Sequence, residues 1–191
     1  MWVESAEVRP GRPRSDQARL AVLHAVDDLL QEIGYAAMTM KGIAERAGVG
    51  RQTVYRWWST KAEILLEASA LDAVEDLQVP DHGEPADLIS AYLKALSEFL
   101  NSPAGGAYRA LIGAAQQDTA VAELLSTNDV FGASARNIIS RVLGPMTPTK
   151  ERLAIDTLVG PVVFRALNGH RFARKELQQL ATLYLSAWAT G

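Results

Sequence analysis

Side chains suited to binding a polyanion are concentrated in fifteen residues, AGVGRQTVYRWWSTK, which run from Ala47 to Lys61. The stretch holds two arginines, a lysine, a tyrosine and two tryptophans. A guanidinium pairs with phosphate or with the edge of guanine, a glutamine amide pairs with adenine, and a threonine methyl contacts thymine. Gln52, Thr53 and Arg56 supply these three groups. The segment therefore has the chemistry needed to read the edges of DNA bases.

The distribution of charge separates this segment from the rest of the chain. Residues 1–61 contain nine Lys and Arg against seven Asp and Glu, whereas the remainder contains ten against fifteen, for a net charge of −3. A basic head on an acidic body indicates two functions in one chain, although chance scatter of a few charges would look the same.

Composition excludes several kinds of site and partner. The 191 residues include no cysteine, so neither disulfides nor thiolate zinc sites can form. We predict no cofactor and no metal. We also predict no membrane partner, because no apolar run is long enough to span a bilayer. The first residues lack the apolar core of a signal peptide, so we expect a cytoplasmic protein.

Hydrophobic periodicity predicts an all-α fold of about nine helices, with no segment alternating as a strand would. In the first helix Ala18, Val22, Ala25, Leu29 and Ile33 form a stripe of helical period, between an N-cap at Ser15 and a stop at Gly34. A proline at 161 should kink the eighth helix or open space beside it. The expected ranges are 15–33, 40–47, 51–58, 60–77, 86–100, 103–117, 118–143 with an optional break near Asn128, 148–168 and 173–189.

The second and third helices form a helix-turn-helix, since GVG allows the sharp turn between them. An eight-residue third helix is about 12 Å long, comparable with the width of the major groove. Val54 and Trp58, four residues apart, should face Ile43 and Ala44. The opposite face then presents Gln52, Thr53 and Arg56 to base edges, while the flanking residues suit phosphates: Thr39, Arg51, Tyr55, Trp57 and Lys61. Packing in the core explains Trp57 equally well.

The segment TMKGIAERAGVGRQTVYRWWSTKAEIL resembles the DNA-binding motif of the TetR (tetracycline-repressor) family of bacterial transcription regulators. The matching positions are Thr39, Ile43-Ala44, Ala47-Gly48-Val49, Thr53-Val54-Tyr55, Trp57-Trp58 and Lys61. The resemblance implies that Thr39, Tyr55, Trp57 and Lys61 bind phosphates and that residues 51–53 read bases. Gly50 departs from the usual Ser, which removes a helix cap, and tryptophans replace the more usual His or Tyr followed by Phe.

Upstream of the motif, GRPR at 11–14 predicts an extended, non-helical arm whose Arg12 and Arg14 contact DNA. A tail with no partner is the alternative. The expected domains are 1–60, which binds DNA and includes a basic arm at 1–14 and the helix-turn-helix at 40–58, and 61–191, which binds ligand and dimerises.

So small a head needs a second copy to read a palindrome, with centres about 34–36 Å apart on one face of the duplex. We expect a homodimer formed by helices 148–168 and 173–189, a pairing that the resemblance supports; their apolar stripe would also suit an ordinary core. The expected outcome is a repressor that leaves its DNA operator when an unidentified small, largely apolar effector binds.

Seven residues are the candidates for the effector site: Tyr92, Phe99, Tyr108, Arg109, Gln116, Phe131 and Phe164. Aromatic residues on helices are also typical of a plain core, which leaves a constitutive or architectural DNA-binding dimer as the alternative. We predict no catalytic residue, because the three histidines are far apart in the sequence and no GxGxxG, P-loop or HExxH motif is present.

Overall fold

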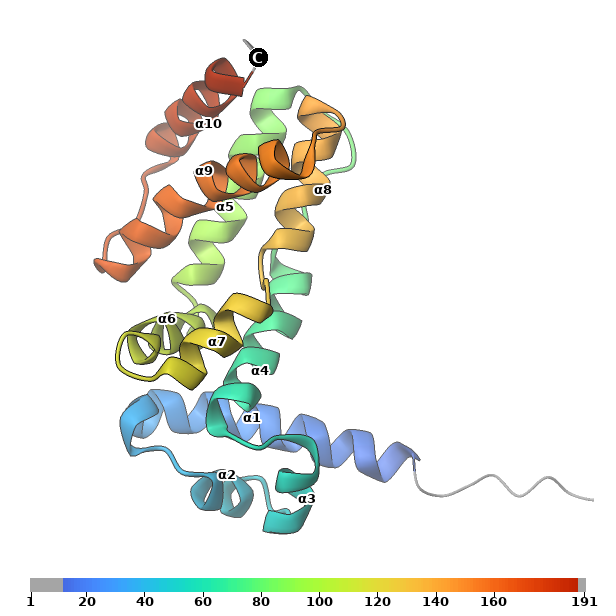
Figure 1. Ribbon diagram of the computed structural model, residues 1–191, viewed down its shortest axis with the longest axis vertical. Helices are drawn as coiled ribbons and strands as arrows, with labels where there is room; N and C mark the ends of the chain where they lie inside the picture. The colour runs from blue at the N-terminus through green and yellow to red at the C-terminus, as the bar shows by residue number, and fades with distance from the viewer. Residues whose placement is uncertain (1–11, 189–191) are drawn as a thin grey trace, which may run out of the picture. The chain divides into compact units, whose positions relative to one another are not determined.

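The structure is a computed structural model that describes residues 12–188, with side chains from Ser15 onward. Ten α-helices and no strand occur in this range (Figure 1). They are α1 (Arg12–Ala37), α2 (Met40–Arg46), α3 (Arg51–Trp57), α4 (Lys61–Asp76), α5 (Pro85–Leu100), α6 (Pro103–Ala115), α7 (Thr119–Thr127), α8 (Gly132–Leu143), α9 (Pro148–Leu167) and α10 (Arg174–Trp188). The predicted all-α class is confirmed. None of these described helices is long and apolar enough to cross a membrane.

The segment 118–143 accounts for the tenth helix, because it breaks after Asn128, where the sequence allowed a break. Asp118 caps α7 by accepting hydrogen bonds from the backbone amides of Ala120 (3.0 Å) and Val121 (3.4 Å). The Asp129 carboxylate accepts a hydrogen bond from the backbone amide of Gly132, the first residue of α8, at 2.7 Å. The expected single helix is therefore two helices, with the break at residues 128–131.

The beginning of α1 differs from the prediction. The helix starts at Arg12, so residues 12–14 form its first turn, and the expected N-cap at Ser15 and the extended arm as far as residue 14 are wrong. The first turn of a helix tolerates proline, because its amide has no intrahelical partner there. Ile33, the last member of the expected buried stripe, is 50% exposed, and helical geometry breaks at Gly34 (φ 74°) as predicted.

The chain divides into two compact units between Ile64 and Leu65, whereas the sequence suggested a boundary at residue 60. The first unit contains α1, α2 and α3, with α2 in contact with both of the others. Its buried side chains include Val22 and Val26 of α1 and Ile43 of α2, each 0% exposed. This unit carries the whole helix-turn-helix.

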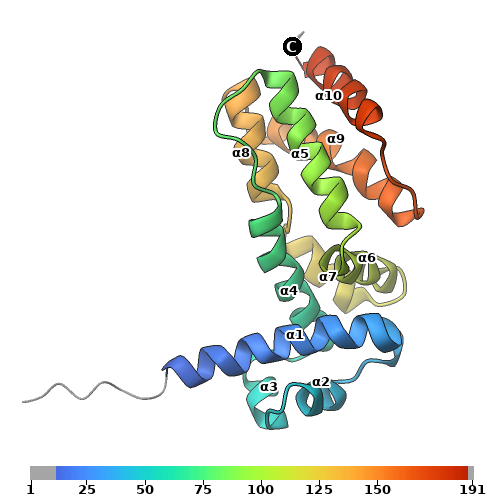
Figure 2. The same ribbon diagram turned by 180° about the vertical axis from the view of Figure 1, so that it is seen from behind.

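In the second unit α5 is the central helix and contacts α6, α8, α9 and α10 (Figure 2). Its wide apolar face is buried along the length of the helix: Leu88, Ile89, Tyr92, Leu93, Leu96, Phe99 and Leu100. The Tyr92 hydroxyl bonds to Ser134 Oγ of α8 at 3.2 Å, and the Tyr184 hydroxyl of α10 donates to the Ala154 carbonyl of α9 at 3.2 Å. The expected amphipathic helix at 86–100 thus organises the body of the protein.

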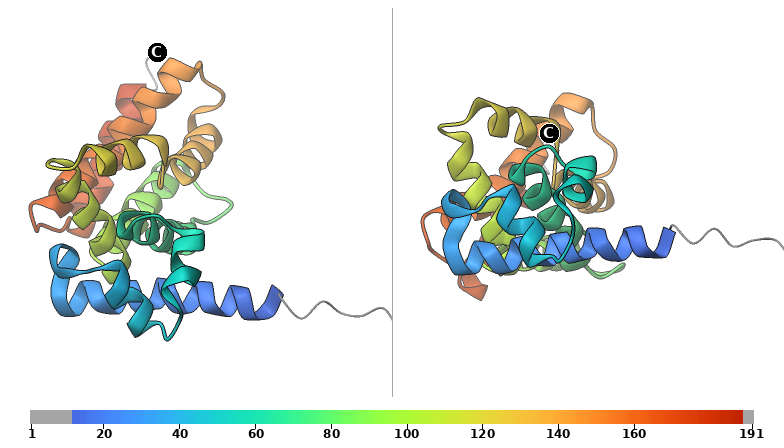
Figure 3. Two further views of the ribbon diagram at one scale, coloured as in Figure 1. Left: turned by 60° about the horizontal axis from the view of Figure 1, so that its bottom comes forward. Right: turned by 90° about the horizontal axis from the view of Figure 1, so that it is seen from below.

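A close approach of backbones occurs where α6 follows α5. A Cβ atom on Gly105 would lie 2.1 Å from the Phe99 carbonyl oxygen and 2.5 Å from Leu100 Cα, so only glycine fits. After this turn α6 lies beside α7 (Figure 3). Helix α9 continues through Pro161 to Leu167.

Candidate nucleic-acid interface

The α2 helix is held at its beginning by Thr39. The hydroxyl oxygen of Thr39 accepts a hydrogen bond from the Gly42 amide at 3.1 Å, which makes Thr39 the N-cap of α2. Ile43 and Ala44 are 0% and 1% exposed, so the helix buries the expected face. The N-terminal turn of α2 is thereby ordered, with exposed Thr39 at its start.

The turn between α2 and α3 depends on Gly48, whose φ of 65° lies in the left-handed region. The Val49 amide donates to the Ala44 carbonyl at 3.1 Å, which closes the end of α2. Gly50 occupies the N-cap of α3 and has no side chain to accept from its amides, so the cap is missing as the sequence indicated. The turn is set by backbone geometry rather than by a capping side chain.

The α3 helix has one inner and one outer face. Val54 and Trp58 are 0% and 3% exposed and anchor it inward, as predicted. The outer side carries Arg51, Gln52 and Arg56, all exposed, and Thr53 is half-buried. Tyr55 is 55% exposed, so its hydroxyl also lies on the accessible side.

Trp57 lies between these two environments. It is half-buried, and its ring meets the Trp58 ring edge-on with centroids 5.5 Å apart. The Arg56 guanidinium stacks over the Trp57 ring, 5.0 Å from its centroid. Arg51 and Arg56 form no ion pair with any carboxylate of the described residues. Their charge is therefore uncompensated, which a polyanion partner requires.

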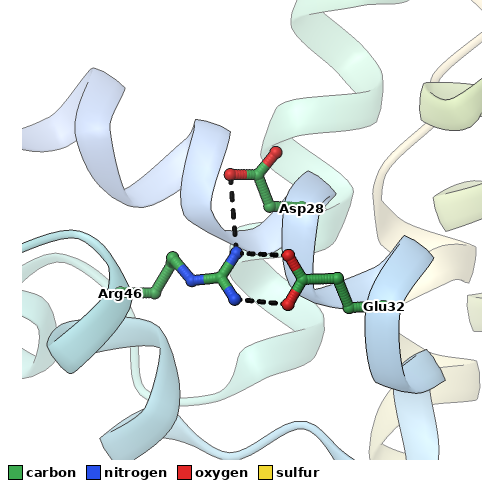
Figure 4. Close-up of polar contacts among 3 residues, drawn as sticks. All are labelled: Asp28, Glu32 and Arg46. Atoms are coloured by element: carbon green, nitrogen blue, oxygen red, sulfur yellow. Dashed lines mark hydrogen bonds and ion pairs between the residues drawn. The ribbon is translucent and has the colours of Figure 1, made fainter.

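An ion-pair network that sequence reasoning missed fastens α2 to α1 (Figure 4). The Arg46 guanidinium forms two hydrogen bonds with the Glu32 carboxylate, one of them 2.8 Å long, and lies 3.7 Å from Asp28. The hydrogen bond from Arg46 lowers the pKa of Glu32. Asp28 and Glu32, spaced by one turn of α1, were the signal available in the sequence. Arg46 thus positions α2 and its charge is compensated.

Comparison with known proteins identifies the whole arrangement. The family model described as "Bacterial regulatory proteins, tetR family" matches residues 22–68. An uncharacterized HTH-type transcriptional regulator of Bacillus subtilis strain 168, YdeS, is 35% identical over 162 residues, which cover 82% of each chain. The chain belongs to the TetR family. It is a DNA-binding transcriptional regulator and not an enzyme, in agreement with the resemblance seen in the sequence.

Solved TetR-family structures share the fold. The regulator SCO0332 is 30% identical, with a TM-score of 0.70 over 89% of this chain and 97% of that one. The multidrug binding protein EbrR, solved with imidazole, is 17% identical, with a TM-score of 0.64 over 93% and 97% of the two chains. At that identity EbrR is evidence for the fold alone.

Lys61, for which the TetR-family resemblance implied a phosphate contact, makes contacts within the first unit. Its ammonium donates hydrogen bonds to the carbonyls of Tyr35 (2.6 Å), Met38 (2.9 Å) and, more weakly, Ala36 (3.5 Å). It also lies 4.2 Å from the centroid of the Tyr35 ring. Burial lowers the pKa of Lys61, while the carbonyls favour its charged form. These contacts give Lys61 an internal role, tying the start of α4 to the segment that leads into Thr39.

The remaining DNA candidates, Arg12 and Arg14, have their backbones in the first turn of α1, and their side chains lie outside the described residues. The arm before residue 12 also lies outside them. Within the described residues no group of three His, Asp or Glu side chains could hold a metal ion.

Four of the seven candidates for the effector site, Tyr92, Phe99, Tyr108 and Phe131, come together in the core of the second unit. Phe131 meets Phe99 and Tyr108 edge-on, with centroids 5.8 and 4.8 Å apart. Phe99 and Phe131 are 1% and 4% exposed. Tyr108 also contributes to a polar surface hollow of about 440 Å³ beside Asp129. The ring of Phe131 thus packs directly against the rings of Phe99 and Tyr108.

Tyr92 is fully buried in this cluster, and burial raises its pKa to about 12. The other three candidates lie outside the cluster. Arg109 donates to the Ala166 carbonyl at 3.2 Å, and Gln116 is exposed at the end of α6. Phe164 is 69% exposed on α9, so its ring faces away from the core. Helix packing thus directs the side chains of Arg109, Gln116 and Phe164 away from the aromatic cluster, and an effector site formed by all seven residues stays a prediction.

Proposed function

We propose that this TetR-family chain is a homodimeric repressor that reads a palindromic operator through α3 and releases it when a small molecule binds the second unit. The observation that carries the proposal is the outer face of α3. Gln52 and two arginines without carboxylate partners are exposed there, opposite the buried anchors Val54 and Trp58. A short helix with this division of faces suits insertion into the major groove. Since its target is the chromosome of a bacterium, we assign the protein to the cytoplasm.

Base reading and phosphate binding are divided among the exposed residues. Gln52 suits the adenine edge, and Arg51, Arg56 and Thr53 suit guanine and thymine. The hydroxyls of Thr39 and Tyr55, the Trp57 ring edge, and the side chains of Arg12 and Arg14 are assigned to the backbone of the duplex. Lys61 is not assigned to DNA, because its ammonium donates hydrogen bonds to the carbonyls of Tyr35 and Met38.

Dimerisation through α9 and α10 is supported by exposed apolar side chains. Leu153, Phe164 and Leu167 of α9 are 53%, 69% and 44% exposed, and Leu183 of α10 is 65% exposed. The spacing of the three α9 residues places them on one face of the helix, together with Gly160. Nothing lies within 4 Å of the position a Gly160 Cβ would take, so a partner helix has room to approach there. Large apolar groups exposed in a row are typical of an interface.

Selection of bound duplexes from a random pool tests DNA reading. We expect recovered sites to contain two inverted half-sites with centres about 10–10.5 base pairs apart, or a multiple of that distance. Gln52→Ala should relax the preference at one base pair of each half-site by about 1–3 kcal/mol. Tyr55→Phe should weaken binding to all sequences alike. Recovery of no preferred sequence would refute the proposal.

Sedimentation tests the dimer. Phe164→Glu should produce monomers and reduce operator affinity, whereas Leu71→Glu, at a similarly exposed leucine of α4, should leave the dimer intact. A dimer unchanged by Phe164→Glu would show that the interface lies elsewhere.

An effector-free DNA-binding dimer is the second candidate. The direct packing of Phe99, Phe131 and Tyr108 favours it, because rings expected to line a cavity fill the core. Operator affinity measured across a library of small molecules separates the two candidates: release by at least one compound supports the first, and constant affinity supports the second.

A further inference from the structure

A groove in the second unit provides a binding site away from the packed aromatic core. It has a volume of about 650 Å³ and lies between α5 and α10 with the connection that precedes α10. This size is within the range of sites for small organic ligands. On the α5 side its lining runs from Asp87 to Asn101, a distance of about 21 Å at 1.5 Å per residue. The groove is therefore long enough for an extended molecule.

The lining of the groove combines apolar and polar side chains. Ala91 of α5, Leu177 of α10 and Phe172 of the connection contribute carbon surface. Ser97 also lines the groove, although it is only 7% exposed. Its hydroxyl can donate a hydrogen bond to a ligand atom in the groove.

One end of the groove is cationic. Arg171 and Arg174 both line it, and neither forms an ion pair with a carboxylate of the described residues. Arg174 is the first residue of α10, and Figure 2 shows that α10 runs antiparallel to α5, so its start is the end of α10 nearer to the C-terminal half of α5. The guanidinium groups are thus placed toward the end of the groove that contains Ser97.

The acidic groups of the lining do not cancel this charge. Glu98 is paired with Lys94, whose ammonium lies 2.7 Å from its carboxylate. Asp87 is in the first turn of α5, at the opposite end from the start of α10. The groove therefore offers the apolar surface of Ala91, Phe172 and Leu177, two guanidinium groups without carboxylate partners, and the Ser97 hydroxyl.

We propose that this groove binds an amphipathic carboxylate, with the carboxylate on Arg171 and Arg174 and the apolar chain along Ala91, Phe172 and Leu177. Guanidinium groups bind carboxylates through paired N–H donors, and the Ser97 hydroxyl adds a further donor. This inference deepens the proposed function, on which its regulatory meaning rests, by naming the chemical class of the effector and its site.

Calorimetric titration of the full chain with decanoate tests the site. We expect one decanoate per chain, with 1-decanol and decyltrimethylammonium bound at least about tenfold more weakly, since the lost contacts involve charged groups. The double variant Arg171→Gln, Arg174→Gln should lose at least about tenfold in decanoate affinity. Arg152→Gln, at an exposed arginine of α9 outside this groove, should bind as the wild type does.

Two further variants separate ligand binding from effects on folding. Ala91→Trp should fill the groove and abolish binding, and Ser97→Ala should weaken binding while circular dichroism stays unchanged. Absence of decanoate binding, equal binding of 1-decanol, or equal binding by the double arginine variant would overturn the inference. A double variant that is monomeric, with no decanoate binding to the wild type, would show that a second copy of the chain occupies the groove.

The same titration repeated with a selected operator duplex distinguishes the two proposals. Decanoate that binds in the groove and also releases the operator supports both. Decanoate that binds without changing operator affinity supports the site and refutes its regulatory role. Operator release by another compound, with no decanoate binding, refutes the site and leaves the proposed function standing.

Discussion

Replacement of Lys61 by methionine separates an internal role for this lysine from a phosphate contact. Methionine keeps most of the apolar stem and removes the ammonium, so the Met38 carbonyl loses this donor and the Tyr35 carbonyl keeps only the Met38 amide, 3.3 Å away. It also removes the cation from the Tyr35 ring, 4.2 Å away. If the ammonium holds the connection between α1 and α2, the ordered state of α2 should become less stable.

The magnitude follows from the contacts that are lost. Hydrogen bonds to charged groups contribute about 1.5–3 kcal/mol each, and an exposed cation–π contact about 0.5–1 kcal/mol. Lys61 is only half-buried, so water replaces part of this interaction, and we expect a net loss of about 2 kcal/mol. That loss corresponds to an increase of about 30-fold in the population of the opened segment.

Hydrogen exchange followed by mass spectrometry measures this local opening in the full chain. The Ile43 and Ala47 amides donate to the carbonyls of Thr39 and Ile43 at 3.0 and 2.9 Å, so peptides covering α2 should exchange about 30-fold faster. Lys41→Met is the matched control. Lys41 forms only an exposed pair with Glu45, 3.6 Å away, and its loss should change stability by less than about 0.5 kcal/mol.

The opposite result is equally informative. If exchange of α2 is unchanged in Lys61→Met, while the slope of log affinity for DNA against log salt falls by about one unit, Lys61 contacts a phosphate and the internal role is refuted.

Three more outcomes are expected from the structure. Gly105→Ala should destabilise the fold by about 1–3 kcal/mol or more, because the Cβ of the alanine would clash with the backbone at the end of α5. Gly113→Ala, in the same helix with nothing within 4 Å, should stabilise it by up to about 1 kcal/mol in urea unfolding. The pKa of Glu32 is lowered by Arg46, so the stability from this pair is present above the ordinary carboxyl pKa and is lost as pH falls through the lowered pKa. Glu32→Gln should remove this acid dependence from the hydrogen exchange of the α2 amides. If the pH profile of that exchange is the same as in the wild type, the Arg46–Glu32 pair is not its cause. Burial raises the pKa of Tyr92 to about 12. The contribution of the neutral Tyr92 to the free energy of unfolding is therefore complete below about pH 10, the ordinary tyrosine pKa. It is lost as pH rises from about 10 to about 12, at up to about 1.4 kcal/mol per pH unit. Tyr92→Phe should flatten alkaline unfolding monitored by circular dichroism, and an unaltered slope would show that another group titrates.

The helices and the two faces of the helix-turn-helix could be predicted from sequence because the signals are local. The four-residue spacing of Val54 and Trp58 sets the inner face of α3, and Thr39 and Asp118 have the side chains that cap the helices they precede. The start of α1 was misplaced by three residues, because proline in a first turn and proline in an extended arm have the same local sequence.

Contacts between residues far apart in the chain were decided by the tertiary structure alone. Lys61 reaches carbonyls at 35–38, and Arg46 reaches Glu32, although local sequence would place both cations in solvent. The tertiary structure also decided which contacts the aromatic residues of the second unit make. Periodicity indicates that Phe99 is buried, but only the crossing of α5, α6 and α8 determines that its ring meets Phe131 and not a ligand.

Thus the amino-acid sequence by itself determined the helical class, the family and the residues that α3 exposes, since each depends on spacings of a few residues along one helix. The tertiary structure decided which charges are already paired, which aromatic side chains fill the core, and where a groove remains between α5 and α10. The physical reason is that pairing and packing depend on distances between helices, which no spacing within one helix specifies.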